Sequence, residues 1–332
     1  MASVTKADNR IVKELEAAAQ RLEAVRAAIG QVIFGQSEVV ELSLIAILAG
    51  GHALLVGAPG LAKTKLAASL GRILGLAEKR VQFTPDLMPA DILGSEVLEE
   101  SERGKRQFRF VPGPVFCQLM MADEINRASP RTQSALLQAM QEHHVTVAGA
   151  RHDLPRPFHV LATQNPIEQE GTYPLPEAQL DRFLLEIDVP YPSLEAERRM
   201  LFATTGAEEA EVRPVLSAAE LINAQRLTRL IPVGEQVAEA ILAIVRKARP
   251  GAEADDFINR HVAWGPSPRA SQALMLGARA RALLQGRLSP SIDDVAALVS
   301  PVFRHRMALN FTARAEGHTV ESAIARLRDT LA

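Results

Sequence analysis

The chain has 332 residues, of which 47% are hydrophobic, so it is long enough for two domains with a sizeable buried core. Its formal net charge of −2 argues against a strongly basic nucleic-acid-binding protein, and its single cysteine, Cys117, excludes an intrachain disulfide. No run approaches the ~20 apolar residues of a membrane span, and the first ten residues lack the apolar core of a signal peptide. A cytoplasmic protein is therefore expected.

The first predicted element is an amphipathic helix from about residue 9 to residue 29, followed by Gly30. Large apolar residues recur along one of its faces every three or four residues, apart from an alanine-filled gap. They are Ile11, Leu15, Leu22, Val25 and Ile29. We expect this helix to pack on the core domain or on a neighbouring subunit. A second helix is predicted to run to Gly50, with Ser37 as its candidate N-cap.

The most informative stretch follows an apolar run at residues 52–56 and reads Gly57-Ala58-Pro59-Gly60-Leu61-Ala62-Lys63-Thr64, with a helical pattern from Lys65 onward. Strand, glycine-containing turn, Lys-Thr and helix is the layout of a P-loop that binds a nucleoside triphosphate. Backbone N–H groups of the turn and of the helix N-terminus converge on the phosphates. Lys63 would contact the β- and γ-phosphates, and the Thr64 hydroxyl would bind Mg²⁺.

One position departs from the general pattern G-x-x-x-x-G-K-[ST], because Ala62 stands where the second glycine is expected. If the backbone has a positive φ there, the alanine Cβ costs roughly 1–2 kcal/mol. If the position requires only close packing, one methyl group can be tolerated. On this loop alone, a plain strand-to-helix turn that carries a surface lysine remains the alternative.

Two further strand ends carry polar side chains. Residues 119–122 form an apolar run that ends in Asp123 and Glu124, and residues 158–164 form a third predicted strand that ends in Asn165. Ligands bind at the carboxyl ends of parallel strands. Asp123 would hold Mg²⁺, Glu124 would orient the attacking water or accept its proton, and Asn165 would contact the γ-phosphate or the water. The plainer alternatives are a solvated acidic turn and, for Asn165-Pro166, a simple turn start.

Strands that alternate with helices predict an α/β core with a parallel sheet and helices on both faces. Two segments interrupt this succession of strands and helices, at residues 91–111 and 145–157. In both, apolar and polar residues alternate as in a β-hairpin. A hinge is expected at residues 190–193, because two prolines flank Tyr191. Beyond it the chain is mostly helical, with segments near residues 194–204, 217–228, 235–248, 268–285, 291–303 and 319–331, whereas residues 255–258 have the character of a loop.

With these motifs in place, the chain resembles the AAA+ ATPases and, within them, the MoxR family. The resemblance runs from about Ile33 into the C-terminal region. Besides the P-loop, its most specific stretches are residues 123–133 (DEINRASPRTQ) and 170–183 (EGTYPLPEAQLDRF). The MoxR P-loop commonly carries alanine before the lysine, so Ala62 supports this assignment.

The resemblance implies roles that spacing alone cannot give. Arg182 matches the arginine finger, which reaches the γ-phosphate bound to the neighbouring subunit. Arg269 matches the sensor-2 arginine of the lid, which touches nucleotide in its own subunit. A planar guanidinium suits both roles because charge develops on the γ-phosphoryl oxygens. Phe34 and Gly35 match the segment that lies near adenine, although such an apolar run is more often part of a core.

The resemblance also implies a domain plan: an N-terminal helix (1–30), an ATPase core (31–190) and a C-terminal α-helical lid (191–332). The hairpin at 91–111 corresponds to the helix-2 insert and that at 145–157 to the pre-sensor-1 hairpin. In related ring motors these hairpins face the pore or the client.

The function implied is an Mg²⁺-dependent ATPase that assembles into a ring, expected to be a hexamer, and remodels or activates a protein client with a von Willebrand factor A domain. A motor subunit for metal insertion, like that of magnesium chelatase, is a second reading. A nucleic-acid motor is a third, and the mildly acidic charge argues against it. A nucleotide-binding switch that does not hydrolyse is the non-catalytic alternative, and it would have no need of Glu124.

Overall fold

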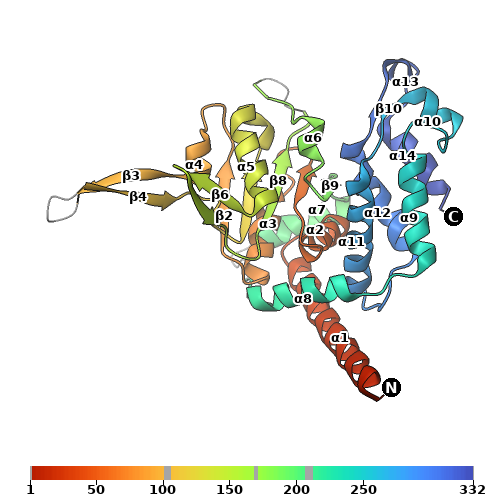
Figure 1. Cartoon of the computed structure of the whole chain (residues 1–332), viewed down its shortest axis with the longest axis horizontal. Coiled ribbons are helices and arrows are strands. Elements are labelled where there is room, and N and C mark those ends of the chain that lie inside the picture. Colours follow the sequence, from red (N-terminus) through yellow and green to blue (C-terminus); the bar gives the residue numbers. More distant parts are fainter. Residues whose placement is uncertain (1, 101–105, 168–170, 206–211, 332) are drawn as a thin grey trace.

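The computed structural model describes residues 2–100, 106–167, 171–205 and 212–331, with side chains from residue 10 onward. Its centre is a five-stranded parallel sheet in the order β2-β5-β8-β1-β9 (Figure 1). These strands are β1 (Ala53–Val56), β2 (Glu78–Gln82), β5 (Leu119–Asp123), β8 (His159–Gln164) and β9 (Leu185–Asp188). Because all five run the same way, the carboxyl ends of β1, β5 and β8 meet at one edge.

Alternating residues of the central strands pack into two separate cores. Leu55, Met121 and Leu161 join a core that contains α1 (Ala2–Gly30), α2 (Ser37–Leu48) and α3 (Lys63–Ile73), together with much of the C-terminal region. Met120 and Val160 point the other way, into a core with α4 (Pro89–Leu93) and α5 (Pro130–Glu142). The predicted α/β architecture with helices on both faces of the sheet is thereby confirmed.

The expected start of α2 is wrong by one residue. Gln36 occupies the N-cap position, and Ser37 is the first residue of the helix. The Gln36 side chain instead donates through Nε2 to the carbonyl oxygen of Leu61, at 3.0 Å. This buried hydrogen bond ties the start of α2 to the P-loop.

Two antiparallel hairpins leave the core. The first consists of β3 (Gly94–Glu100) and β4 (Arg106–Pro112), which project together from the body of the molecule (Figure 1). Its predicted tip includes residues 101–105, which lie outside the described residues. The second consists of β6 (His144–Val147) and β7 (Ala150–Asp153). Both pairings agree with the alternation in the sequence, and the first insertion begins with α4 before the hairpin.

The C-terminal region is helical, as expected. After α6 (Glu177–Leu180) and α7 (Leu194–Thr205) it contains α8 (Ala218–Leu230), α9 (Glu235–Lys247), α10 (Asp256–His261), α11 (Pro268–Leu284), α12 (Ile292–Phe303), α13 (Phe311–Ala315) and α14 (Val320–Asp329). The prediction of a loop at residues 255–258 is wrong, because α10 begins there. Its N-cap Asp255 accepts a hydrogen bond from the backbone N–H of Ile258 at 2.8 Å. The short strands β10 (Val262–Trp264) and β11 (Ala308–Leu309) pair antiparallel beside it.

Helix α1 packs on this framework through its predicted face, since Leu22, Val25 and Ile29 are almost fully buried. Two ion pairs join it to α8: Arg21 with Glu220, and Glu14 with Arg226 at 2.7 Å. Beyond that contact α1 extends away from the body (Figure 1). Among the helices that the structure describes, none combines the length and the apolar character needed to cross a membrane.

The Glu186 carboxyl on β9 couples fold stability to pH. Burial raises its pKa from 4.5 to about 7, against the opposing charge of Arg304. Because the folded chain holds this proton more tightly than the unfolded chain, the free energy of unfolding falls as pH rises from 4.5 to about 7. At pH 8, Glu186→Gln is therefore expected to exceed the wild type in unfolding free energy by on the order of 2–3 kcal/mol.

Urea unfolding at pH 8 and pH 4 would measure this difference. It should disappear at the lower pH, because the Glu186 carboxyl is then protonated in both the folded and the unfolded chain. The exposed carboxylate Glu239 provides a matched control, and Glu239→Gln should change little at either pH. A Glu186→Gln variant no more stable than the wild type at pH 8 would contradict the assignment.

Candidate active site

A cavity of about 400 Å³ opens at the carboxyl edge of the sheet. The P-loop and α3 form one wall, and the ends of β2, β5 and β8 form the other. It is lined by Pro59, Gly60, Leu61, Ala62, Lys63, Thr64, Lys65, Arg80, Gln82, Asp123, Glu124, Thr163 and Asn165. The polar candidates from two strand ends and from the P-loop thus come together at a single place.

Backbone carbonyl groups of the P-loop hold its lysine in position. Lys63 Nζ donates to the carbonyl oxygens of Gly57 and Ala58, the latter at 2.8 Å. Burial lowers the pKa of the Lys63 ammonium, while the nearby carboxylates of Asp123 and Glu124 act in the opposite direction. The N-terminus of α3 starts at this residue, so the helix presents its first N–H groups and a cation to the same cavity.

Ala62 adopts the left-handed conformation, with φ 57° and ψ 18°. The P-loop therefore has the backbone geometry for which glycine is usual, and the alanine Cβ carries the strain. Ala62→Gly is expected to raise the free energy of unfolding by about 1 kcal/mol, because relief of the strain outweighs the greater freedom of glycine in the unfolded chain.

A neighbouring alanine gives the matched control. Ala68 lies inside α3, where glycine should lower the unfolding free energy by about 1 kcal/mol. Chemical denaturation of the two variants should therefore shift stability in opposite directions. A loss of stability in both would mean that the strain at Ala62 is negligible.

Asp123 ends β5 and is nearly buried. Its Oδ1 accepts from the Thr163 hydroxyl at 2.6 Å, and its Oδ2 lies 3.3 Å from Thr64 Oγ1. A carboxylate and a threonine hydroxyl at the foot of a phosphate-binding loop are hard oxygen donors of the kind that Mg²⁺ prefers. The residues present therefore fit an Mg²⁺ ion that accompanies a nucleotide.

Glu124 is the next residue and also has a left-handed backbone, with φ 54° and ψ 50°. Its backbone N–H donates to Thr163 Oγ1 at 2.8 Å, so one threonine positions both acids. The Glu124 carboxylate accepts from Gln82 Nε2 at 2.7 Å and from Arg127 at 3.1 Å. This turn directs the carboxylate into the cavity instead of continuing the strand.

Asn165 lines the same cavity at the end of β8. Its Oδ1 accepts from the backbone N–H of Ile167 at 3.1 Å, so the residue forms a turn as well as facing the cavity. The two interpretations of this asparagine are compatible.

Three cavity residues are not predicted as site residues by any motif in the sequence: Arg80, Gln82 and Thr163. Arg80 Nη2 donates to Asp123 Oδ2 at 2.7 Å, and Gln82 holds Glu124 as described above. Both come from β2, an edge strand whose sequence, EKRVQ, has almost no apolar residues to mark it as a strand. The register Gln82↔Asp123, in which β2 pairs with β5, brings them to the acids.

The two predicted catalytic arginines do not line this cavity. Arg182 and Arg269 both line a second one, of about 210 Å³, where the helical region meets the core. Arg269 Nη1 lies 3.8 Å from Asp181 Oδ2, which places it beside the segment that carries Arg182. The structure therefore groups the two arginines with each other and not with Lys63.

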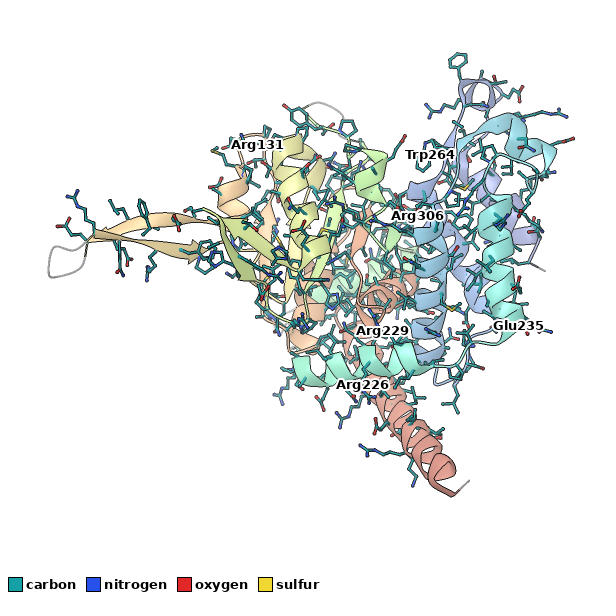
Figure 2. The ribbon with its side chains drawn as sticks, viewed as in Figure 1. Arg131, Arg226, Arg229, Glu235, Trp264 and Arg306 are labelled. Carbon is teal, nitrogen blue, oxygen red and sulfur yellow. The ribbon has the colours of Figure 1, made fainter. Side chains whose placement is uncertain are left out.

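Asp181 anchors this group. Its carboxylate accepts from Arg306 Nε at 2.6 Å and from the Ser267 hydroxyl at 3.0 Å. Arg306 is almost completely buried, lies between α11 and the core (Figure 2), and also donates to the carbonyl oxygens of Phe183 and Val302. Residues 181–183 are thus fixed to the helical region by hydrogen bonds to the Asp181 carboxylate and to the Phe183 carbonyl oxygen.

Phe34 and Gly35 also lie outside the lining of the P-loop cavity. Gly35 has φ +71°, and a Cβ at this position would come within 2.3 Å of the Ala196 Cβ on α7. Its need for glycine is explained by this close approach, which does not bear on a role near adenine.

Comparison with known proteins identifies related chains along nearly the whole length. The AAA model, of ATPases associated with various cellular activities, matches residues 52–185, and an AAA lid domain model matches residues 256–327. The chain is 40% identical to Chaperone MoxR1 of Mycobacterium tuberculosis, with 96% of this chain and 84% of that protein aligned. It is 34% identical to Protein MoxR of Paracoccus denitrificans, with 87% and 89% aligned. The crystal structure of a protein from Cytophaga hutchinsonii gives a TM-score of 0.87 at 32% identity over 98% of each chain.

Proposed function

Because the chain belongs to the MoxR family of AAA+ ATPases, we propose that it is an ATP-hydrolysing motor that remodels or activates a protein client. The observation that carries the proposal is the convergence of Lys63, Asp123 and Glu124 on one cavity at the sheet edge. A switch that only binds nucleotide would have no use for a carboxylate in the position of Glu124.

In the proposed reaction, Lys63 and the first N–H groups of α3 bind the phosphates. Glu124 orients the attacking water and accepts its proton, and Asn165 donates its amide to the γ-phosphate or to the water. A bound Mg²⁺, held by Thr64 and Asp123, would neutralise charge on the β- and γ-phosphate oxygens. The Thr163 hydroxyl group holds Asp123 and Glu124 in position through its two hydrogen bonds.

We assign both Arg182 and Arg269 to the nucleotide of the neighbouring subunit. Their common placement supports this, because both line a cavity distinct from that of their own P-loop. For Arg269 this replaces the expectation of contact with nucleotide in its own subunit. The proposal requires an oligomer in which one subunit contacts the nucleotide of the next, and the family resemblance favours a hexameric ring.

The client that we propose contains a von Willebrand factor A domain, an assignment that rests on the family resemblance. The β3–β4 hairpin offers a contact surface, since Val97, Leu98 and Phe108 are exposed apolar side chains on it. To test the client, tagged Glu124→Gln protein would be mixed with lysate, ATP and Mg²⁺, and captured proteins would be identified by mass spectrometry. Lys63→Ala, which should not retain ATP, is the control.

ATP-dependent capture of a von Willebrand factor A-domain protein supports the proposal. Capture of chelatase subunits would favour a metal-insertion motor. Duplex DNA that stimulates ATP turnover in a strongly salt-dependent way would favour a nucleic-acid motor. Either result would replace the proposed client while leaving the ATPase assignment intact.

A further inference from the structure

Three potential metal ligands meet at the outer end of the helical region, where α10 and α13 lie side by side (Figure 1). His261 ends α10, Glu316 follows α13, and His318 lies two residues further on. Glu316 Oε2 lies 3.7 Å from His261 Nδ1 and 3.6 Å from His318 Nε2, and all three ligand atoms lie within 4.8 Å of one another. Ligand atoms held tetrahedrally at about 2.1 Å from one ion are about 3.4 Å apart, so small side-chain rotations close the set.

One atom of the cluster lacks a partner that its burial requires. His261 Nδ1 is buried and makes no hydrogen bond with any residue that the structure describes. At 3.7 Å, the Glu316 carboxylate is too distant to be its acceptor. A buried polar atom without a partner is unfavourable, and a cation between the imidazole and the carboxylate would satisfy both.

The backbone around the cluster fixes the positions of all three residues. The carbonyl oxygen of His261 accepts from the N–H of Asn310 at 2.9 Å. Gly317, with φ +80°, reverses the chain after α13, and the backbone N–H of His318 bonds to the carbonyl oxygen of Ala313 at 2.9 Å. This turn holds Glu316 and His318 side by side and opposite His261. The ligands are therefore arranged before any ion binds.

An apolar wall covers one side of the cluster. The Phe257 ring lies 4.6 Å from the His261 ring and 5.1 Å from the His318 ring, measured between centroids. The Arg326 guanidinium lies over the Phe257 ring and forms an ion pair with Asp255 at 2.7 Å. Its positive charge is therefore compensated. Apolar surroundings restrict water and strengthen the metal–ligand interactions.

We propose that His261, Glu316 and His318 form a binding site for a divalent cation of the zinc type. Two imidazole nitrogens and one carboxylate oxygen are ligands that suit Zn²⁺, and a tetrahedral ion would keep its fourth position for water. Such an ion would join the end of α10 to the α13–α14 turn, far along the chain from the P-loop. The site is independent of the proposed ATPase activity.

The test titrates the full-length protein with Zn²⁺ against a chromophoric chelator, without nucleotide and with excess Mg²⁺. The wild type is expected to bind one Zn²⁺ at this site. Glu316→Gln and His318→Ala should each weaken binding by at least about 10–100-fold, the loss that follows even from removal of an outer hydrogen-bond partner of a ligand. Glu316 is exposed, so its substitution leaves the packing intact. The visible spectrum of Co²⁺ would report tetrahedral nitrogen and oxygen ligation.

A second histidine–glutamate pair gives the matched control. His144 Nε2 lies 3.3 Å from Glu142 Oε2, and no third ligand joins them among the described residues. His144→Ala should bind Zn²⁺ like the wild type, and so should Asp123→Asn, which removes the carboxylate at the P-loop. The proposal is overturned if the wild type binds no Zn²⁺, if Glu316→Gln and His318→Ala bind like His144→Ala, or if Asp123→Asn abolishes the binding.

Discussion

Arg182→Ala is expected to lower ATP turnover by about 10³–10⁵-fold while leaving ATP binding almost unchanged. The guanidinium would stabilise charge that develops on the γ-phosphoryl oxygens of the neighbour's ATP, so its loss acts on the transition state more than on the bound substrate. Steady-state phosphate release and nucleotide titration would measure the two quantities. Arg229→Ala, at an exposed arginine on α8 (Figure 2), is the control and should behave like the wild type.

Mixing two inactive variants separates action across an interface from action within one chain. Arg182→Ala retains its own Lys63 and Glu124, whereas Glu124→Gln retains Arg182. If Arg182 acts on the neighbouring subunit, mixed rings contain interfaces with every catalytic group, and part of the activity returns. No recovery on mixing, with mixed assembly verified by two different tags, would place Arg182 in its own site or outside the reaction.

Glu124→Gln is expected to reduce turnover by about 10²–10⁴-fold and to trap the ATP state. The amide keeps the size of the side chain but cannot accept the proton of the attacking water. Single-turnover hydrolysis would measure the loss, and ATP retained on the protein after gel filtration would verify binding.

Two further variants make this result specific. Lys63→Ala should lose ATP binding together with turnover, so it separates failure to bind from failure to react. Glu142→Gln, at the exposed carboxylate that ends α5, should leave both unchanged. Wild-type turnover in Glu124→Gln would refute the role of this carboxylate.

Much of the cavity at the P-loop could be predicted from sequence because its parts are local. A buried parallel strand is a continuous apolar run, and the polar residue that ends it is necessarily at the carboxyl edge of the sheet. Asp123 and Asn165 are therefore predictable beside the P-loop, and the structure brings them to one cavity. The longer helices were also predictable, since apolar residues recur on one face of each over three or more turns.

The rest depends on pairing between distant segments. Arg80 and Gln82 reach the acids only because β2 pairs with β5 in a particular register, and a charged edge strand has no pattern that reveals it. Helix α10 is only six residues long, which is too short for a clear helical period. The grouping of Arg182 with Arg269 depends on how the helical region docks, through Asp181 and Arg306, onto the core.

The fixing of residues 181–183 by Arg306 and Ser267 has a genetic consequence if Arg182 acts on the adjacent subunit. A substitution that loosens this attachment would leave the chain's own P-loop intact and impair the active site next to it. In a cell that produces both forms, each defective chain would disable a wild-type neighbour. Such alleles would be dominant, whereas a defect confined to folding of the single chain would be recessive.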